Sequence, residues 1–137
     1  MTNVILLVSD EDRADCPLQR ALTRTAPEFR VELVDNRAGI EALRTPSVIL
    51  LDLSQEGALD VLRWLRTDPR YEQIPVFVLA PQADDVTNAY ALGANSCFLK
   101  QPVPEGLEQP IMQGIAAYAS LIAESARGNS TSATSMV

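Results

Sequence analysis

The chain has 137 residues with a hydrophobic fraction of 47% and a net charge of −7, which predicts one globular domain with a sizeable core and excludes a disordered chain. The acidic balance disfavours direct binding to nucleic acid, because phosphates would be repelled. No apolar run has the length of a membrane helix and no signal-peptide pattern is visible, so a cytoplasmic protein without membrane contact is expected.

Short apolar runs along the chain are typical of β-strands. They are Val4–Val8, Val31–Val34, Val48–Leu51, Val76–Leu79 and Cys97–Leu99. All except Val31–Val34 are continuously apolar, which is the pattern of parallel strands buried on both faces.

Amphipathic helical segments alternate with these strands. Their predicted apolar faces carry Leu18, Ala21, Leu22 and Thr25; Ile40 and Leu43; Ala58, Val61, Leu62 and Leu65; Val86, Ala89 and Tyr90; and Ile111, Ile115, Tyr118 and Ile122. Pro46 should stop the second helix near Thr45, and Gly93 should close the fourth as a C-cap. The alternation predicts an α/β fold, with one parallel sheet covered by helices on both faces.

The domain is expected to span residues 1–126. Residues 127–137 contain the small, polar run GNSTSATSMV and are predicted to form a C-terminal tail. No internal repeat and no linker to a second domain is visible.

Charged residues follow three of the predicted strands. Asp10 follows the first strand, Asp52 the third and Lys100 the fifth. Ligands of open parallel sheets bind beyond the carboxyl ends of the strands. If the first and third strands are neighbours, Asp10 and Asp52 converge and favour a hard divalent cation such as Mg²⁺ between them. The alternative is a solvated loop, which fits Asp10 better than Asp52, since Asp52 directly follows four apolar residues.

Lys100 is the single lysine of a chain with ten arginines, which favours a role for a compact point charge at that position. The chain has no histidine, so Ser-His and Cys-His nucleophile pairs are excluded, and any phosphohistidine must belong to a partner.

The loop after the first strand lacks glycine, and no P-loop or GxGxxG motif is present, which disfavours a flavin or nucleotide site. The cysteines, Cys16 and Cys97, show no metal-binding spacing and are predicted to be reduced thiols.

The segments VILLVSDEDRAD, PSVILLDLS, IPVFVLA and LGANSCFLKQPV resemble the receiver domain of bacterial response regulators. The resemblance extends from about Asn3 to the fifth helix and is greatest to single-domain receivers, which carry no output domain. The predicted fold is therefore a flavodoxin-like, doubly wound sheet with strand order 2-1-3-4-5 and five helices.

The resemblance also implies roles for individual residues. Asp52 would accept a phosphoryl group from a sensor histidine kinase or a histidine phosphotransfer protein, and Lys100 would contact that group. Mg²⁺ would be held by Asp10, Asp52 and the backbone carbonyl of Ser54. The chain would then be no enzyme beyond self-catalysed transfer to, and hydrolysis from, its own Asp52, and it would signal to an unidentified downstream protein.

Several positions depart from the family pattern. Ser9 stands in place of the first of two acids, and Glu11 should point away from the site, so Mg²⁺ binding is expected to be weak. Ala80 replaces a hydroxyl residue and Cys97 an aromatic residue that take part in switching. Gln101 separates Lys100 from Pro102 and so interrupts the Lys-Pro pair at which the family has a cis peptide, which leaves the conformation of this segment open. The loop in DLSQEGALDVL is shorter than usual.

Two interpretations follow, and the first is preferred. One is a phosphoacceptor receiver of a phosphorelay with altered switching. The other is a pseudo-receiver, a protein-interaction module that needs no phosphorylation. A small-molecule enzyme of flavodoxin-like fold is a remote third. The fifth helix also carries Met112, Ala116, Ala119 and Leu121 beyond its core stripe, which suggests a homodimer or partner surface as an alternative to an alanine-rich packed helix.

Overall fold

The computed structural model describes residues 3–9, 17–35, 37–42, 46–100 and 108–117. Along these residues strands and helices alternate in the order β1 (Asn3–Val8), α1 (Pro17–Thr25), β2 (Phe29–Val34), α2 (Arg37–Ala42), β3 (Val48–Asp52), α3 (Ala58–Thr67), β4 (Val76–Ala80), α4 (Ala83–Ala91), β5 (Ser96–Leu99) and α5 (Glu108–Ala117). The five strands form one sheet in the order β2-β1-β3-β4-β5, and every neighbouring pair is parallel. The predicted fold and strand order are confirmed.

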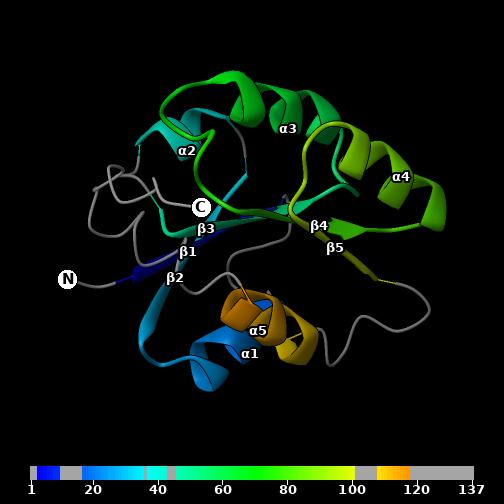
Figure 1. Ribbon diagram of the computed structural model, residues 1–137. Coiled ribbons are helices and arrows are strands. Elements are labelled where there is room, and N and C mark those ends of the chain that lie inside the picture. Colours follow the sequence, from blue (N-terminus) through cyan, green and yellow to red (C-terminus); the bar gives the residue numbers. More distant parts are fainter. Residues whose placement is uncertain (1–2, 10–16, 36, 43–45, 101–107, 118–137) are drawn as a thin grey trace.

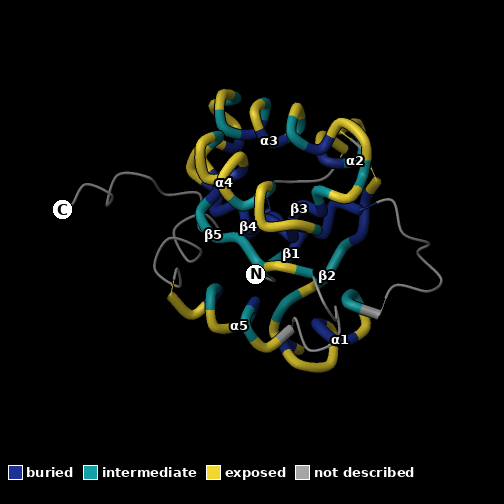
Figure 2. The backbone as a smooth tube through the Cα atoms, turned by 90° about the vertical axis from the view of Figure 1, so that its right-hand side faces the viewer, coloured by how far each residue is buried: buried dark blue, intermediate teal, exposed yellow. Residues whose placement is uncertain are grey.

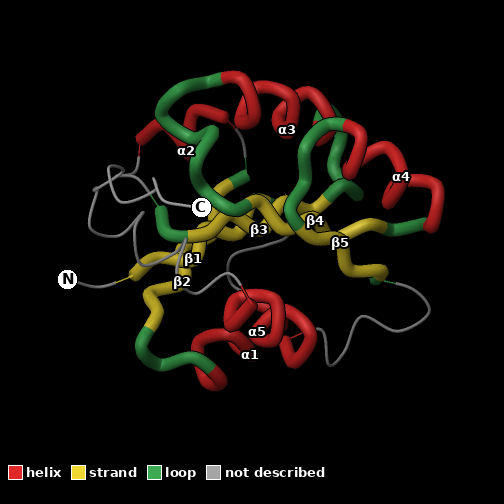
Figure 3. Tube along the Cα trace, viewed as in Figure 1, coloured by secondary structure: helices red, strands yellow, loops and turns green. Residues whose placement is uncertain are grey.

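Helices cover both faces of the sheet, as predicted for a doubly wound fold (Figure 1). Helices α2, α3 and α4 lie on one face, and α1 and α5 lie on the other (Figure 3). This arrangement follows from right-handed crossovers between parallel strands. It leaves the carboxyl ends of β1, β3, β4 and β5 together at one edge.

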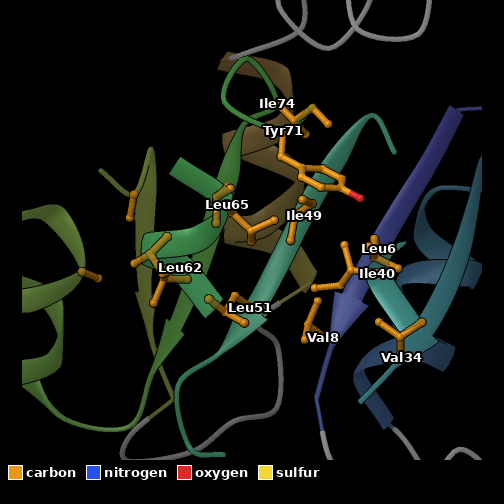
Figure 4. Close-up of a cluster of buried hydrophobic side chains, with 14 of the residues drawn as sticks. Leu6, Val8, Val34, Ile40, Ile49, Leu51, Leu62, Leu65, Tyr71 and Ile74 are labelled. Carbon is orange, nitrogen blue, oxygen red and sulfur yellow. The ribbon is translucent and has the colours of Figure 1, made fainter. Parts of the chain in front are cut away.

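Successive residues of each strand feed two separate cores. In β1, Leu6 and Val8 pack toward α2 and α3, whereas Ile5 and Leu7 pack toward α1 and α5. The first of these cores is drawn in Figure 4, where Leu62 and Leu65 of α3 lie over Ile49 and Leu51 of β3. Strands β3 and β4 are buried at every residue, and the tube of Figure 2 shows exposed residues concentrated on the outer sides of the helices.

Two glycines with positive φ mark helix ends. Gly93, at φ 103°, ends α4 in a Schellman motif, in which the Ala94 N–H donates to the carbonyl of Ala89 and the Gly93 N–H to that of Tyr90. This confirms the predicted C-cap. Gly57, at φ 79°, precedes α3 and ends the short loop that connects it to β3. An L-residue would be strained at either position.

The loop between α3 and β4 is held by aromatic and ionic contacts. The indole N–H of Trp64 donates to the Asp68 carboxylate at 3.2 Å, and its ring packs against Tyr71 and under the Arg37 guanidinium. Arg70 also bonds Asp68, at 2.8 Å. These hydrogen bonds lower the pKa of Asp68 to about 2, and the bond from Arg70 makes the largest contribution.

Some sequence predictions differ from the structure. Tyr90, predicted on the buried face of α4, is 51% exposed, because Ala89 and Val86 already fill the contact between α4 and the sheet. Thr25 is exposed, and the core position at the end of α1 is taken by Ala26. Other predictions, namely Leu43, Tyr118, Ile122, Cys16 and the boundary after residue 126, lie outside the described residues. In the described part of the chain, no helix has the length and apolarity needed to span a bilayer.

Candidate functional site

Asp52 is the buried acid at the carboxyl edge of the sheet. It is the last residue of β3 and pairs with Leu79 of β4, and only 3% of it is exposed. A carboxylate at such a depth is costly unless donors surround it. The contacts of its two oxygens therefore define the site.

Three donors reach the Asp52 carboxylate. The backbone N–H of Ser54 donates to Oδ1 at 2.9 Å. On the other oxygen, Oδ2, the Lys100 Nζ lies at 3.0 Å and the Ser9 hydroxyl at 3.3 Å. Asp52 and Lys100 thus form a largely buried ion pair, whose side chains are 4% and 20% exposed respectively. Lys100 was expected at the same edge as Asp52, and the structure pairs the two side chains directly. The convergence of Asp10 with Asp52 stays a prediction, because Asp10 lies outside the described residues.

The strand ends hold Lys100 and Ser9 in place through their backbones. The Lys100 N–H donates to the carbonyl of Ala80, which extends the β4–β5 pairing by one residue. The Ser9 N–H donates to the carbonyl of Val34 at the end of β2. Both side chains therefore start from rigid positions, which favours a preorganised site.

Two contacts of this site were not predicted from the sequence. Lys100 Nζ also donates to the Ser54 hydroxyl at 3.2 Å, and the Gln55 side-chain amide donates to the carbonyl of Val8 at 3.4 Å. The loop after β3 is thereby tied to β1 and to Lys100. The only sequence signal was a pair of polar residues, Ser54 and Gln55, that begins two positions after the buried acid.

The oxygen donors near Asp52 suit a hard cation such as Mg²⁺. The described donors are the Asp52 carboxylate and the Ser9 hydroxyl that bonds it, while Asp10 and Glu11 lie outside the described residues. The Ser54 carbonyl stays a predicted ligand. Among the residues that the structure describes, no cluster of three acidic, cysteine or histidine side chains occurs. The donor types fit Mg²⁺, but the described shell holds one carboxylate, which Lys100 already neutralises.

Ala80 and Cys97, the positions that the family resemblance links to switching, lie on the side of the sheet that faces α4. Ala80 is fully buried, and its methyl group has no hydrogen-bonding capacity. Cys97 is half-buried and free, with its Sγ 3.9 Å from the carbonyl oxygen of Val86. Burial raises the pKa of the Cys97 thiol, and a hydrogen bond with Tyr90 opposes this shift.

Helix α5 presents little apolar surface within its described part. Ile111 and Ile115 are buried, and Met112 packs against the same core. The outward positions are Gln109, Gln113, Ala116 and Ala117. Ala119 and Leu121 lie outside the described residues, so the homodimer surface stays a prediction.

Comparisons with known proteins match the chain to solved receivers. No family model and no curated protein matches it. The phosphorylated cyanobacterial phytochrome response regulator RcpA is 31% identical, with 86% of this chain and 94% of that chain covered and a TM-score of 0.63. The Mn²⁺-bound response regulator Rcp1 is 30% identical over 85% of this chain and 94% of that chain, with a TM-score of 0.61.

A third match is the signal receiver domain of a DNA-binding response regulator from Colwellia psychrerythraea 34H. It is 26% identical, covers 83% of this chain and 98% of that chain, and has a TM-score of 0.67. The resemblance carried by the strand-end motifs thus extends to the whole domain of solved regulators. The chain belongs to the receiver domains of response regulators in two-component signalling.

Proposed function

We propose that Asp52 accepts a phosphoryl group from the phosphohistidine of a sensor histidine kinase or a histidine phosphotransfer protein. The observation that carries this proposal is the buried Asp52 carboxylate, paired at 3.0 Å with the single lysine at the edge where the strands end. A structural ion pair alone would not require this placement at the ligand-binding edge of the fold.

The chemistry needs positioning and charge rather than a further nucleophile. An Asp52 oxygen attacks phosphorus, the phosphorus–nitrogen bond to the partner's imidazole breaks, and a phosphorus–oxygen bond forms. Hydrolysis later returns the carboxylate and inorganic phosphate. Lys100 would stabilise charge on the phosphoryl oxygens, as cationic groups do in phosphoryl transfer. The chain acts on no other substrate in this proposal.

Asp10, Asp52 and the Ser54 carbonyl would hold Mg²⁺, which supplies positive charge to the phosphoryl oxygens when bound. The Mn²⁺-bound form of Rcp1 supports a divalent site in a related receiver. We expect weak affinity here, because Ser9 contributes no charge and Lys100 competes for Asp52 Oδ2.

Transmission through β4 and β5 is proposed to be poor. Ala80 cannot donate a hydrogen bond to a phosphoryl group, and Cys97 is too small to repack much surface if it rotates. A conformational change requires a difference in interaction between two states. We therefore expect the α4 and α5 helices to respond little to phosphorylation.

The proposal is tested with a small phosphodonor and Mg²⁺. We expect an acid-labile phosphoryl group on the wild-type chain and none on Asp52→Ala, detected by intact mass and ³¹P NMR. Circular dichroism of both proteins controls for folding. An unmodified wild-type chain under conditions that label another receiver would contradict the proposal.

A second candidate is the phosphorylation-independent interaction module. It is favoured by the hydrogen bonds of the Asp52 carboxylate, whose two oxygens already accept bonds from Ser9, Ser54 and Lys100 and need no metal ion to be stabilised. In that case Asp52→Asn would leave partner binding unchanged. Under the preferred proposal the same variant would bind the kinase but block phosphoryl transfer.

The proposed partners are a kinase or phosphotransfer protein and an unidentified downstream protein, all in the cytoplasm. Direct contact with nucleic acid or membrane is not expected. Sedimentation of the chain at several concentrations would test homodimer formation through α5.

A further inference from the structure

The site holds a hydroxyl group that the proposed chemistry has not used. The Ser54 Oγ accepts a hydrogen bond from Lys100 Nζ at 3.2 Å. An ammonium group donates only, so the hydroxyl proton of Ser54 is not used in this bond, nor in any other contact shown among the described residues. Ser54 is exposed, whereas the methyl group of Ala80 is buried in the core beneath α3 and α4.

We infer that the Ser54 hydroxyl donates a hydrogen bond to the phosphoryl group on Asp52, and so replaces from the β3–α3 loop the donor that Ala80 lacks at the end of β4. The inference rests on the proposed phosphorylation of Asp52. It assigns Ser54 two functions: its backbone carbonyl would face the cation, and its side chain would face the phosphoryl group.

The geometry supports contact between Ser54 and a phosphoryl group. Lys100 Nζ bonds both Asp52 Oδ2 and Ser54 Oγ, at 3.0 and 3.2 Å. Because both oxygens bond the same nitrogen, the distance between Asp52 Oδ2 and Ser54 Oγ cannot exceed the sum of these two lengths. The oxygens of a phosphoryl group on Asp52 would lie between these two atoms. It must also arrive from the solvent side, where Ser54 is exposed and Lys100 is half-buried.

Ser9 is a poorer donor for this purpose. Its hydroxyl group already donates to Asp52 Oδ2, and the residue is only 2% exposed. A phosphoryl group that approaches from solvent meets Lys100 and Ser54 before it meets Ser9. Of the hydroxyl groups described at this edge, that of Ser54 is both accessible and oriented by Lys100.

This placement changes which part of the domain responds. A bond to Ser54 acts on the short loop that Gly57 ends and that Gln55 ties to the carbonyl of Val8. The phosphorylated and unphosphorylated states would then differ mainly at residues 53–60, where α3 begins. The β4–α4 loop gains no new bond in either state.

The test uses beryllofluoride with Mg²⁺ as the phosphoryl mimic on the full chain. Ser54→Ala keeps the backbone N–H that bonds Asp52 Oδ1 and removes only the hydroxyl group. We expect beryllofluoride to bind about tenfold more weakly, as for one hydrogen bond to a charged group. Ser54→Thr should restore binding, and Ala80→Ser should restore part of it in the Ser54→Ala background.

Thr67→Ala is the matched control. It removes an exposed hydroxyl group at the far end of α3, where Thr67 Oγ1 bonds the Arg63 carbonyl, and it should leave binding unchanged. Trp64 fluorescence during urea unfolding verifies that each variant folds. In ¹H–¹⁵N spectra of the wild-type chain, the largest shifts should fall at residues 53–60 and be reduced by Ser54→Ala.

Each outcome decides the inference. If wild-type binds beryllofluoride and Ser54→Ala binds equally well, the Ser54 hydroxyl is not a donor, although the proposed function stands. If Ser54→Thr does not restore binding, the effect is one of packing and the inference is wrong. Dominant shifts at residues 81–92 would overturn the route through α3. If wild-type neither binds the mimic nor becomes phosphorylated, the proposed function fails and this inference with it.

Discussion

Removing the lysine of the buried ion pair should cost the fold more than removing the acid. In Lys100→Met the Asp52 side chain, only 4% exposed, keeps its bonds from Ser54 and Ser9 but loses its counter-charge. Breaking a fully buried pair in this way costs about 3–5 kcal/mol. Because Lys100 is 20% exposed, water can enter the space it leaves, and we expect a loss of about 2 kcal/mol in the free energy of unfolding.

Asp52→Asn should behave differently. The amide oxygen can still accept the bond from the Ser54 N–H, and no buried negative charge remains. Lys100 can turn toward water. We expect a free energy of unfolding within about 1 kcal/mol of wild-type, or higher. The double variant Lys100→Met/Asp52→Asn should then resemble Asp52→Asn, which corresponds to a coupling energy of about 2 kcal/mol.

Urea unfolding followed by Trp64 fluorescence and by circular dichroism measures these differences. The chain has a single tryptophan, and coincidence of the two signals tests two-state behaviour. The buffer contains a chelator so that no cation replaces the lost ammonium, and Mg²⁺ added afterwards should recover part of the stability of Lys100→Met. Equal stability of Lys100→Met and wild-type, or additive losses in the double variant, would refute the reasoning.

Three further predictions concern the site, the core and the α3–β4 loop. Ser9→Asp places a second carboxylate beside Asp52 and should tighten Mg²⁺ binding at least about tenfold in calorimetry; no gain would show that Ser9 lies outside the metal shell. Leu62→Ala should lower the free energy of unfolding by about 3 kcal/mol, since Leu62 is fully buried, and a loss under about 1 kcal/mol would contradict the packing. The Asp68 carboxyl group should titrate near pH 2 by ¹³C NMR, and Arg70→Ala should move this midpoint upward. Because the folded pKa lies below the unfolded value of 3.8, ionised Asp68 stabilises the fold above pH 3.8. This contribution is lost as the pH falls through about 2.

The fold was predictable because the strands of a doubly wound sheet carry a strong signal. Runs such as Val48–Leu51 must be apolar throughout, since both faces of the strand are covered. The amphipathic pattern of α4 was less informative. A helix that contacts the sheet through Ala89 comes too close to bury a larger neighbour, and this is why Tyr90 remains exposed.

The candidate site was predictable where topology alone decides it. Residues that end parallel strands lie at the same edge of the sheet, and so Asp52 and Lys100 could be placed there from their positions. Their direct pairing could not be predicted, because β4 lies between β3 and β5 and the long lysine side chain has to reach across it. The bonds of Ser9, Ser54 and Gln55 could not, because they depend on the path of a short loop and on side-chain rotamers. The pattern showed Ser9 only as a missing acid, whereas in the structure it is a donor to Asp52.

The single lysine also makes the occupancy of this site accessible to chemical labelling. An amine that bonds Asp52 and Ser54 and whose side chain is only 20% exposed is poorly accessible to an acylating reagent, and no other lysine side chain competes for the label. The extent of modification at Lys100, read by peptide mass, therefore reports how firmly the carboxylate or its phosphorylated form holds the amine. A mixture of kinase, donor and receiver could be followed in this way without any substitution in the chain.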